Sequence, residues 1–127
     1  MVNVTEEMKN AFDAIIHEAE KQVKENSDAE LVIVAHTAKD KIYSCANYGV
    51  MEGKYEDTER FLQMLVEVDD AEIKYCVCML SSGWLEPPYE CLRKGLLRIS
   101  PKNEETIFCG QGENVLVLKT VKDMMPL

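Results

Sequence analysis

The segment from Ile73 to Leu80 restricts the fold of this chain more than any other, because almost all of its residues are apolar. A strand with one solvated face alternates apolar and polar residues, whereas a strand covered on both faces is apolar throughout. The segment therefore predicts a central strand with a packing layer on each side. The flanking sequence has to supply those layers.

Further elements are predicted before and after this strand. Apolar residues at steps of three and four predict a helix over residues 5–25, with Thr5 as its N-cap. The turn Lys39-Asp40 predicts a hairpin between strands at 31–37 and 41–47. The remaining expected elements are a helix at about 56–69, a helix with Pro88 in its first turn that runs to about Ile99, strands at 106–109 and 115–118 around a turn at 111–114, and a short last helix capped by Thr120 and stopped by Pro126.

This order of elements predicts an α/β fold, a three-layer α/β/α sandwich with a mixed sheet of about five strands. A length of 127 residues fits one domain, so residues 1–127 are expected to fold as a single unit. Hydrophobic residues make up 46% of the chain and charged residues 29%, which is typical of a globular rather than a disordered protein.

The net charge of −9 narrows the range of partners. An acidic surface repels the phosphate backbone of nucleic acids and the headgroups of anionic membranes, so neither is an expected partner. No apolar run approaches the roughly 20 residues that a membrane-spanning helix needs.

The cysteines and the N-terminus predict a cytoplasmic protein. The first ten residues contain acidic side chains and no hydrophobic segment, unlike a secretory signal peptide. The five cysteines are an odd number, which does not suit a disulfide framework. Four of them lie inside apolar runs, where reduced and buried thiols are expected: Cys45, Cys76, Cys78 and Cys109.

Four short segments, spread along the chain, form a common pattern. They are a strand that ends in Asn47, a Gly53 followed six residues later by Glu59-Arg60, a run from Pro87 to Cys91 at the expected start of a helix, and the closing sequence from Thr120 to Leu127. In this order and spacing the segments resemble the cytidine deaminases, small zinc hydrolases that act on free nucleosides. The resemblance extends over nearly the whole chain and implies the same fold.

The resemblance also implies a type of site. In cytidine deaminases one Cys or His and two Cys, at the N-termini of two helices, hold a zinc ion and leave a fourth position for water. The metal lowers the pKa of this water, and the resulting hydroxide attacks the ring carbon that bears the amine. A Glu two residues after the first ligand transfers protons, and an Asn at the end of the second strand binds the ribose. In this sequence the two roles correspond to Glu59 and Asn47.

The three zinc-ligand positions of the family correspond to Asp57, Pro88 and Cys91. The side chain of Pro88 has no donor atom, and one thiolate with one carboxylate makes a poor zinc site. The ribose-binding region departs from the family as well, with Gly49 in place of a Glu and Glu30 in place of a Phe. The resemblance therefore predicts that zinc-dependent deamination has been lost, and that the protein binds no metal or other cofactor.

Two functions stay open. The first is a module that binds a small nucleoside-like ligand or a protein partner, with Asn47, Trp84 and Tyr89 as ligand-binding residues. The second is a divergent zinc-dependent hydrolase that deaminates nucleosides or nucleobases, in which Glu59 carries the protons or Cys91 takes a different role. The same residues have structural explanations, because acids are favoured in the first turn of a helix, and a Trp in a loop often covers the edge of a core.

The apolar C-terminus predicts a homo-oligomer. The strand at 115–118, followed by Met124, Met125 and Leu127, is too apolar for an exposed edge and tail. Closed symmetric assembly is the usual way to bury such a surface. Cytidine deaminases of this length are typically homotetramers in which neighbouring subunits complete each active site, so the resemblance implies a tetramer or, as in smaller relatives, a dimer.

Overall fold

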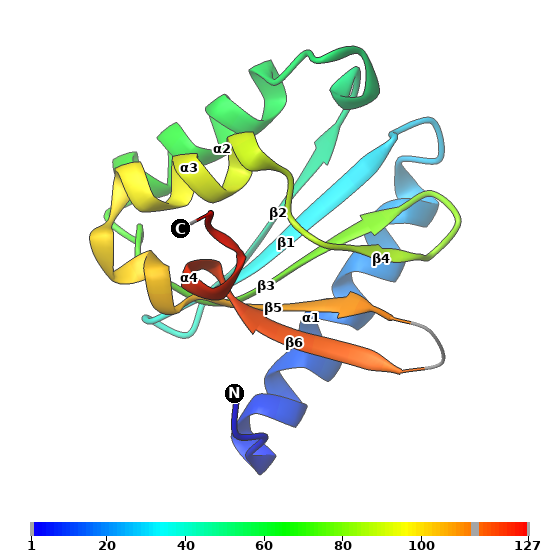
Figure 1. Cartoon of the computed structure of the whole chain (residues 1–127). Coiled ribbons are helices and arrows are strands. Elements are labelled where there is room, and N and C mark those ends of the chain that lie inside the picture. Colours follow the sequence, from blue (N-terminus) through cyan, green and yellow to red (C-terminus); the bar gives the residue numbers. More distant parts are fainter. Residues whose placement is uncertain (1, 113–114, 127) are drawn as a thin grey trace.

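The chain forms one mixed sheet between two layers of helices, in a computed structural model that describes residues 2–112 and 115–126 (Figure 1). The main path of the sheet runs β2-β1-β3-β5-β6, and the short strand β4 pairs with β3 outside this path. In chain order the elements are α1 (Glu6–Glu25), β1 (Leu31–Thr37), β2 (Ile42–Asn47), the 3-10 helix η1 (Val50–Glu52), α2 (Glu56–Glu67), β3 (Ile73–Leu80), β4 (Leu85–Glu86), α3 (Glu90–Ile99), the 3-10 helix η2 (Pro101–Glu105), β5 (Ile107–Gln111), β6 (Leu116–Thr120) and α4 (Val121–Met124).

Strand β3 has the central position that its apolar sequence predicts. It pairs antiparallel with β1 on one side and parallel with β5 on the other. The pairs β1–β2 and β5–β6 are antiparallel, so the sheet is mixed. Residues 75–79 of β3 are all buried, because helices cover both faces of the strand.

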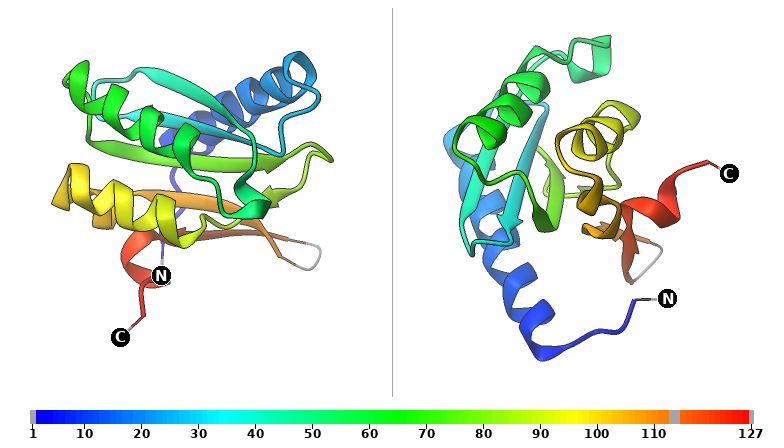
Figure 2. Two further views of the ribbon diagram at one scale, coloured as in Figure 1. Left: turned by 90° about the horizontal axis from the view of Figure 1, so that it is seen from above. Right: turned by 90° about the vertical axis from the view of Figure 1, so that its left-hand side faces the viewer.

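Helix α1 covers one face of the sheet, and α2, α3 and α4 cover the other (Figure 2). The core under α1 joins Phe12 and Ile15 of the helix to Val32 and Val77 of the sheet. The core on the opposite face contains Leu62 and Leu65 of α2, Leu92 and Leu96 of α3, and Ile33 and Phe108 of the sheet. The predicted three-layer α/β/α sandwich is confirmed.

Gly95 allows α2 and α3 to pack closely. A Cβ at this position would lie 2.3 Å from Cδ1 of Leu62, whose side chain is fully buried. The space beside Gly95 is therefore already filled by α2. The two helices lie side by side, and their first turns meet at the same end of the pair (Figure 1).

The predicted helix caps agree with the structure. The Thr5 hydroxyl accepts a hydrogen bond from the Met8 amide at 3.1 Å. Thr120 caps α4 in the same way, and the Asp123 side chain completes a capping box. Within residues 2–112 and 115–126, the structure contains no helix long and apolar enough to cross a membrane.

The expected start of the third helix is wrong. Pro88 lies in an extended linker before α3, and the N-cap of the helix is Tyr89, with φ −75° and ψ 163°. A proline disfavours helical backbone at the residue before it. The consecutive residues Pro87 and Pro88 therefore keep the chain extended beyond β4, and the helix begins only at Glu90.

Other expected boundaries differ by a few residues. Helix α2 ends at Glu67 and not near Asp69, which has a left-handed φ of 55°. Residues 85–86, expected in a loop, form β4 because they pair with Cys78 and Met79. The last two strands extend to Gln111 and Thr120 because their ladder pairs residues 107–111 with residues 116–120. Of the turn expected at 111–114, Glu113 and Asn114 lie outside the described residues.

Candidate functional site

The first turns of α2 and α3 and the end of β2 meet at one place, which we call the α2–α3 junction; it comprises Asn47, Asp57, Thr58, Glu59, Tyr89 and Cys91. Asn47 is the last residue of β2, and Asp57, Thr58 and Glu59 lie in the first turn of α2. Tyr89 is the N-cap of α3, and Cys91 lies in its first turn. The junction therefore contains the sequence-predicted site residues other than Trp84 and Pro88.

A hydrogen-bonded chain links the three elements of the junction. Thr58 Oγ1 donates to Asn47 Oδ1 at 2.7 Å, and it is also hydrogen-bonded to the hydroxyl of Tyr89. A threonine hydroxyl has one proton, so the phenol of Tyr89 is the donor to Thr58. The Nδ2 of Asn47 donates to the carbonyl of Cys45 at 3.2 Å. The side-chain amide of Asn47 is thus fully engaged inside the protein.

Burial keeps the titratable groups beside these hydrogen bonds, Tyr89 and Cys45, protonated. Asn47 and Thr58 have no exposed surface, and the ring of Tyr89 stacks on that of Tyr55 with centroids 5.7 Å apart. Desolvation raises the pKa of Tyr89 well above its ordinary value, although the hydrogen bond to Thr58 acts in the opposite direction. Desolvation also raises the pKa of Cys45 to about 11. At neutral pH both groups are protonated, so Tyr89 can serve as a hydrogen-bond donor but not as a base.

The carboxylate of Asp57 holds the loop that leads into α2. Its Oδ2 accepts a hydrogen bond from the Tyr48 amide at 2.9 Å, and its Oδ1 pairs with the guanidinium of Arg60. Glu30 has a comparable role, because its Oε2 accepts from the Met51 amide at 2.9 Å. The carboxylates of Asp57 and Glu30 therefore both stabilise the conformation of this loop.

Glu59 and Cys91 lie side by side on the outer part of the junction. The Sγ of Cys91 is 3.7 Å from Oε1 of Glu59, and Oε2 of Glu59 is 2.7 Å from Nη2 of Arg98. Partial burial and, after it, the Glu59 carboxylate raise the pKa of Cys91, whereas Arg98 lowers it. Cys91 is therefore a neutral thiol at neutral pH when no metal is bound.

The three residues that the sequence resemblance matches to zinc ligands do not fit a zinc ion. Asp57 is bound to Tyr48 and Arg60, Pro88 offers no side-chain donor, and the thiol of Cys91 lies against a carboxylate. Catalytic zinc sites normally have three protein ligands. In the part of the chain that the structure describes, no three His, Cys, Asp or Glu side chains gather closely enough to hold a metal ion.

Trp84 lies apart from the junction. It immediately precedes β4, in the turn of the β3–β4 hairpin, whereas α3 follows the other end of β4 (Figure 1). Its side chain is 45% exposed. Among the described residues, the hydrogen bonds near it involve only its backbone, with Leu80 and Ser82.

Four residues in and around the junction were given no role from the sequence: Tyr55, Thr58, Arg60 and Arg98. The resemblance contained a signal for Thr58, because the family has Ala between the first zinc ligand and the catalytic Glu. A hydroxyl at that position implies a new hydrogen-bond partner near the start of α2. Arg98 gave no such signal, since only the packing of α3 against α2 brings it to Glu59.

Comparisons with known proteins give matches in structure but not in sequence. No protein-family model matches the chain, and no curated protein matches its sequence. The crystal structure of cytidine deaminase from Mycobacterium leprae is similar with a TM-score of 0.67 and 10% identity, over 91% of this chain and 98% of that one. Cytidine deaminase from Mycobacterium tuberculosis gives a TM-score of 0.63 and 12% identity, over 91% and 94% of the two chains. The chain therefore has a cytidine deaminase-like fold.

Proposed function

We propose that this chain is a cytidine deaminase-fold protein that has lost zinc-dependent deamination and acts by binding a small molecule. The proposal rests on the α2–α3 junction. In the deaminases a zinc ion connects the starts of the two helices. Here a hydrogen bond from the phenol of Tyr89, at the start of α3, to the hydroxyl of Thr58, at the start of α2, connects them. The helices are thus joined without a metal.

The state of Glu59 supports the same conclusion. A proton carrier has to reach a substrate, and its carboxylate must be free to exchange protons there. One oxygen of Glu59 is paired with Arg98 and the other lies beside Cys91. Held in this way, Glu59 is a surface ion-pair residue that links α2 to α3.

The second candidate function, a divergent zinc-dependent deaminase, is favoured by one observation. The contact of 3.7 Å between Cys91 and Glu59 keeps the one remaining zinc-ligand residue next to the one remaining proton carrier. This function would need two further ligands from outside the family's positions. We therefore place it second.

An assay of deamination tests the proposal directly. Cytidine and deoxycytidine are incubated with the purified chain, with and without added zinc, and the change in absorbance is followed. A zinc-containing cytidine deaminase is the positive control, and Glu59→Gln is the matched variant. We expect the wild-type rate to equal both the Glu59→Gln rate and the background. Turnover above background that Glu59→Gln abolishes would establish the second candidate instead.

Nucleosides and nucleobases are the first ligands to test. Trp84 is the single Trp of the chain, so its fluorescence can be followed alongside the melting temperature. We expect at least one nucleoside-like compound to raise the melting temperature. If none does so at millimolar concentration, the ligand belongs to another chemical class.

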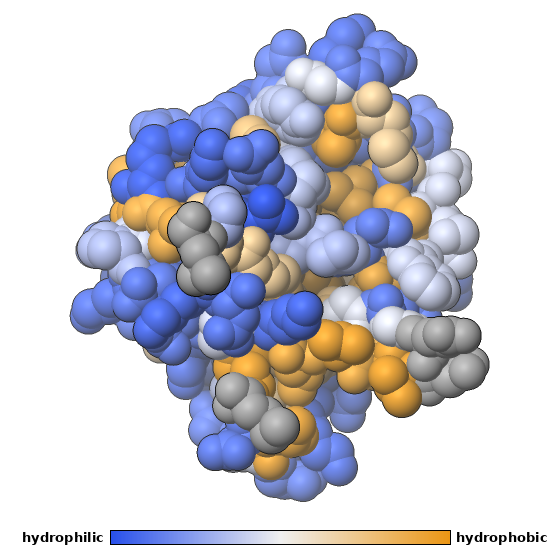
Figure 3. Space-filling view, in the orientation of Figure 1, coloured by the Kyte–Doolittle hydropathy of each residue, from blue (hydrophilic) through white to orange (hydrophobic). Residues whose placement is uncertain are grey.

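We further propose that the protein assembles into a homo-oligomer, a dimer or tetramer, through β6. This strand ends the main path of the sheet. The apolar residue Val115 just before it and the residues Leu116 and Val117 at its start are exposed by 63%, 58% and 37%. Figure 3 shows apolar surface gathered over β6. An exposed edge of this kind can pair with another chain or pack against it.

A further inference from the structure

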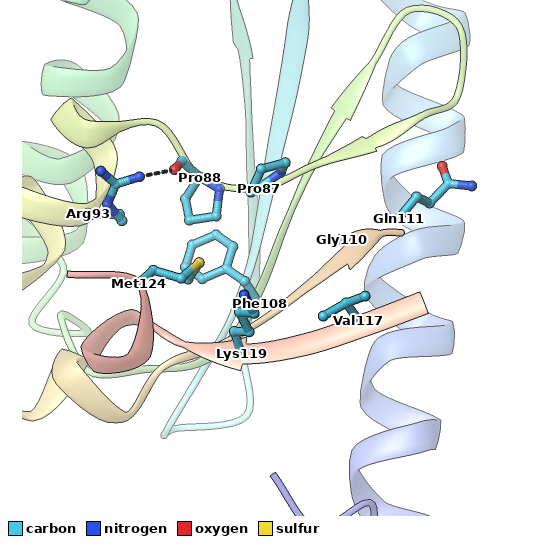
Figure 4. A pocket seen from close by; sticks show the side chains of 9 residues that line it. All are labelled: Pro87, Pro88, Arg93, Phe108, Gly110, Gln111, Val117, Lys119 and Met124. Carbon is cyan, nitrogen blue, oxygen red and sulfur yellow. Dashed lines mark hydrogen bonds between the residues drawn. The ribbon is translucent and has the colours of Figure 1, made fainter. Parts of the chain in front are cut away.

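A cavity of about 430 Å³ lies beside the junction, between the linker that precedes α3, strands β5 and β6, and helix α4 (Figure 4). Its lining residues are Pro87, Pro88, Arg93, Phe108, Gly110, Gln111, Val117, Lys119 and Met124. We call it the β5–β6 pocket. Its volume falls within the range of about 300–1,000 Å³ that is typical of small-molecule sites. Of the expected site residues it includes only Pro88.

One part of the pocket is apolar. The ring of Phe108 lies beneath Pro88, and the side chain of Met124 points toward this ring (Figure 4). Val117 adds a branched side chain from the neighbouring strand. An aromatic ring offers a large apolar contact surface, and a methionine side chain is flexible enough to follow the shape of a ligand. This part of the pocket therefore suits the apolar portion of a ligand.

The charged lining residues of the pocket are both cations. They are Arg93 and Lys119, and the lining contains no Asp or Glu, although the whole chain has 23 acidic and 14 basic residues. Within residues 2–112 and 115–126, neither cation forms an ion pair. The nearby Glu90 is already paired with Lys94 at 2.7 Å. In a protein with a net charge of −9, the two cations without acidic partners in this lining favour an anionic ligand over a cationic one.

Arg93 is held at the pocket by the backbone and not by an acid. Its Nη1 donates to the Pro88 carbonyl at 2.6 Å, which fixes the guanidinium beside the linker. Its Nε is buried and has no hydrogen-bond partner among the described residues. Unpaired buried donors are rare in folded proteins and need an explanation. A positive charge kept in place without a counter-ion is suited to a ligand that supplies one.

We propose that the β5–β6 pocket binds a small organic anion, with its carboxylate or phosphate at Arg93 and Lys119 and its apolar body against Phe108, Met124 and Val117. This inference rests on the proposed function, because it assumes a protein that binds small molecules; it names a ligand class for this pocket that is separate from the nucleosides and nucleobases tested above. It also places the ligand outside the α2–α3 junction. The pairing of charge and apolar surface is the argument for an amphipathic anion over a neutral ligand or an inorganic ion.

Gly110 offers a variant that adds a side chain at the wall of the pocket. A Cβ at this position would have its nearest neighbour, the Pro87 nitrogen, at 3.7 Å, which is an ordinary contact, and the backbone at Gly110 is not left-handed. Gly110→Val therefore adds a β-branched side chain to a strand, where such residues are favoured. Arg93→Gln and Lys119→Gln remove the charges one at a time while keeping comparable length.

The test uses the full chain and three probes: phenyl phosphate, phenylacetate and the neutral phenylacetamide. Amide chemical shifts are followed by NMR during titration to about 10 mM, since ligands of this size bind with modest affinity. We expect saturable shifts centred on the amides of Gly110, Gln111, Lys119 and Met124. The anions should bind at least about fivefold more tightly than phenylacetamide, and the comparison of the two anions distinguishes a phosphate from a carboxylate site.

The three variants test whether the anion binds in the β5–β6 pocket. Arg93→Gln and Lys119→Gln should each weaken anion binding by about fivefold or more and leave phenylacetamide unaffected. Gly110→Val should abolish binding while the amide spectrum stays that of a folded protein. Absence of shifts at these amides, equal affinity for the neutral probe, or binding retained in Gly110→Val would overturn the inference. Failure of the proposed function is recognised separately, because cytidine turnover is measured without these probes.

Discussion

The phenol of Tyr89, at the N-cap of α3, is hydrogen-bonded to the hydroxyl of Thr58 in the first turn of α2. The Thr58 hydroxyl in turn donates a hydrogen bond to Oδ1 of Asn47, at the end of β2, at 2.7 Å. One buried chain of side chains therefore connects both helix starts and the sheet.

Removing the Thr58 hydroxyl should destabilise the fold more than removing that of Tyr89. Thr58→Val leaves both Asn47 Oδ1 and the Tyr89 hydroxyl without a partner, and we expect a loss of about 2–3 kcal/mol in the free energy of unfolding. Tyr89→Phe removes one donor and should cost about 1 kcal/mol. Equilibrium urea denaturation measures both. Tyr48→Phe is the control, because Tyr48 is 44% exposed; equal losses for Tyr48→Phe and Tyr89→Phe would contradict the account.

The reactivity of Cys91 should increase when Glu59 is neutralised. The Glu59 carboxylate raises the pKa of the Cys91 thiol by its charge and its hydrogen bond, while Arg98 lowers it. Glu59→Gln therefore lowers the pKa, increases the thiolate fraction near pH 8, and should speed alkylation by iodoacetamide several-fold. Arg98→Ala should have the opposite effect. Mass spectrometry of the peptide that contains Cys91 gives the rates, and a slower rate in Glu59→Gln would refute this electrostatic arrangement.

A methyl group at Gly95 should disturb the packing of α3 on α2. The Cβ of Gly95→Ala would lie 2.3 Å from Cδ1 of Leu62, which is fully buried and has little room to move. We expect a loss of about 1–3 kcal/mol in the free energy of unfolding, although Ala favours helix more than Gly. Lys94→Ala, at the adjacent exposed position, is the control and should change stability by less than about 0.5 kcal/mol. A stabilised Gly95→Ala protein would show that the helices are farther apart than described.

The exposed apolar edge should lead to self-association. Light scattering coupled to gel filtration should give a multiple of the 14.5 kDa chain mass, and added salt should favour assembly because each chain has a charge of −9. Leu116→Lys should shift the protein toward the monomer. Val66→Lys, at a position of α2 that is 45% exposed, should leave the mass unchanged. A monomer at low and high salt, even at high protein concentration, would exclude an oligomer.

The sequence predicted the layers of the fold because they depend on local patterns. The apolar run at Ile73–Leu80 required a strand covered on both faces, and the spacing of Phe12 and Ile15 required a helix with one buried face. The short strand β4 could not be predicted in this way, since a two-residue strand has no periodicity and exists only through its pairing with β3. The start of α3 was misplaced because Pro88 suits a first helical turn as well as an extended linker.

The candidate site was predictable only in part. The resemblance led to Asn47, Asp57, Glu59, Tyr89 and Cys91, which the structure brings together. It did not show which groups these residues contact, because the packing of the helices and the sheet brings Thr58, Arg60 and Arg98 to them. The β5–β6 pocket left no sequence signal either, since its two cations come from a helix and a distant strand.

Zinc content is the most direct measurement of the central claim, that side chains and not a metal join the starts of α2 and α3. The purified chain is dialysed, with and without prior exposure to zinc, and analysed by plasma emission spectrometry beside a zinc-containing cytidine deaminase. A site with one thiol and one engaged carboxylate, short of the usual three ligands, predicts less than about 0.1 zinc per chain in both samples. One zinc per chain retained through dialysis, and lost in Cys91→Ser, would contradict the account and restore the deaminase function.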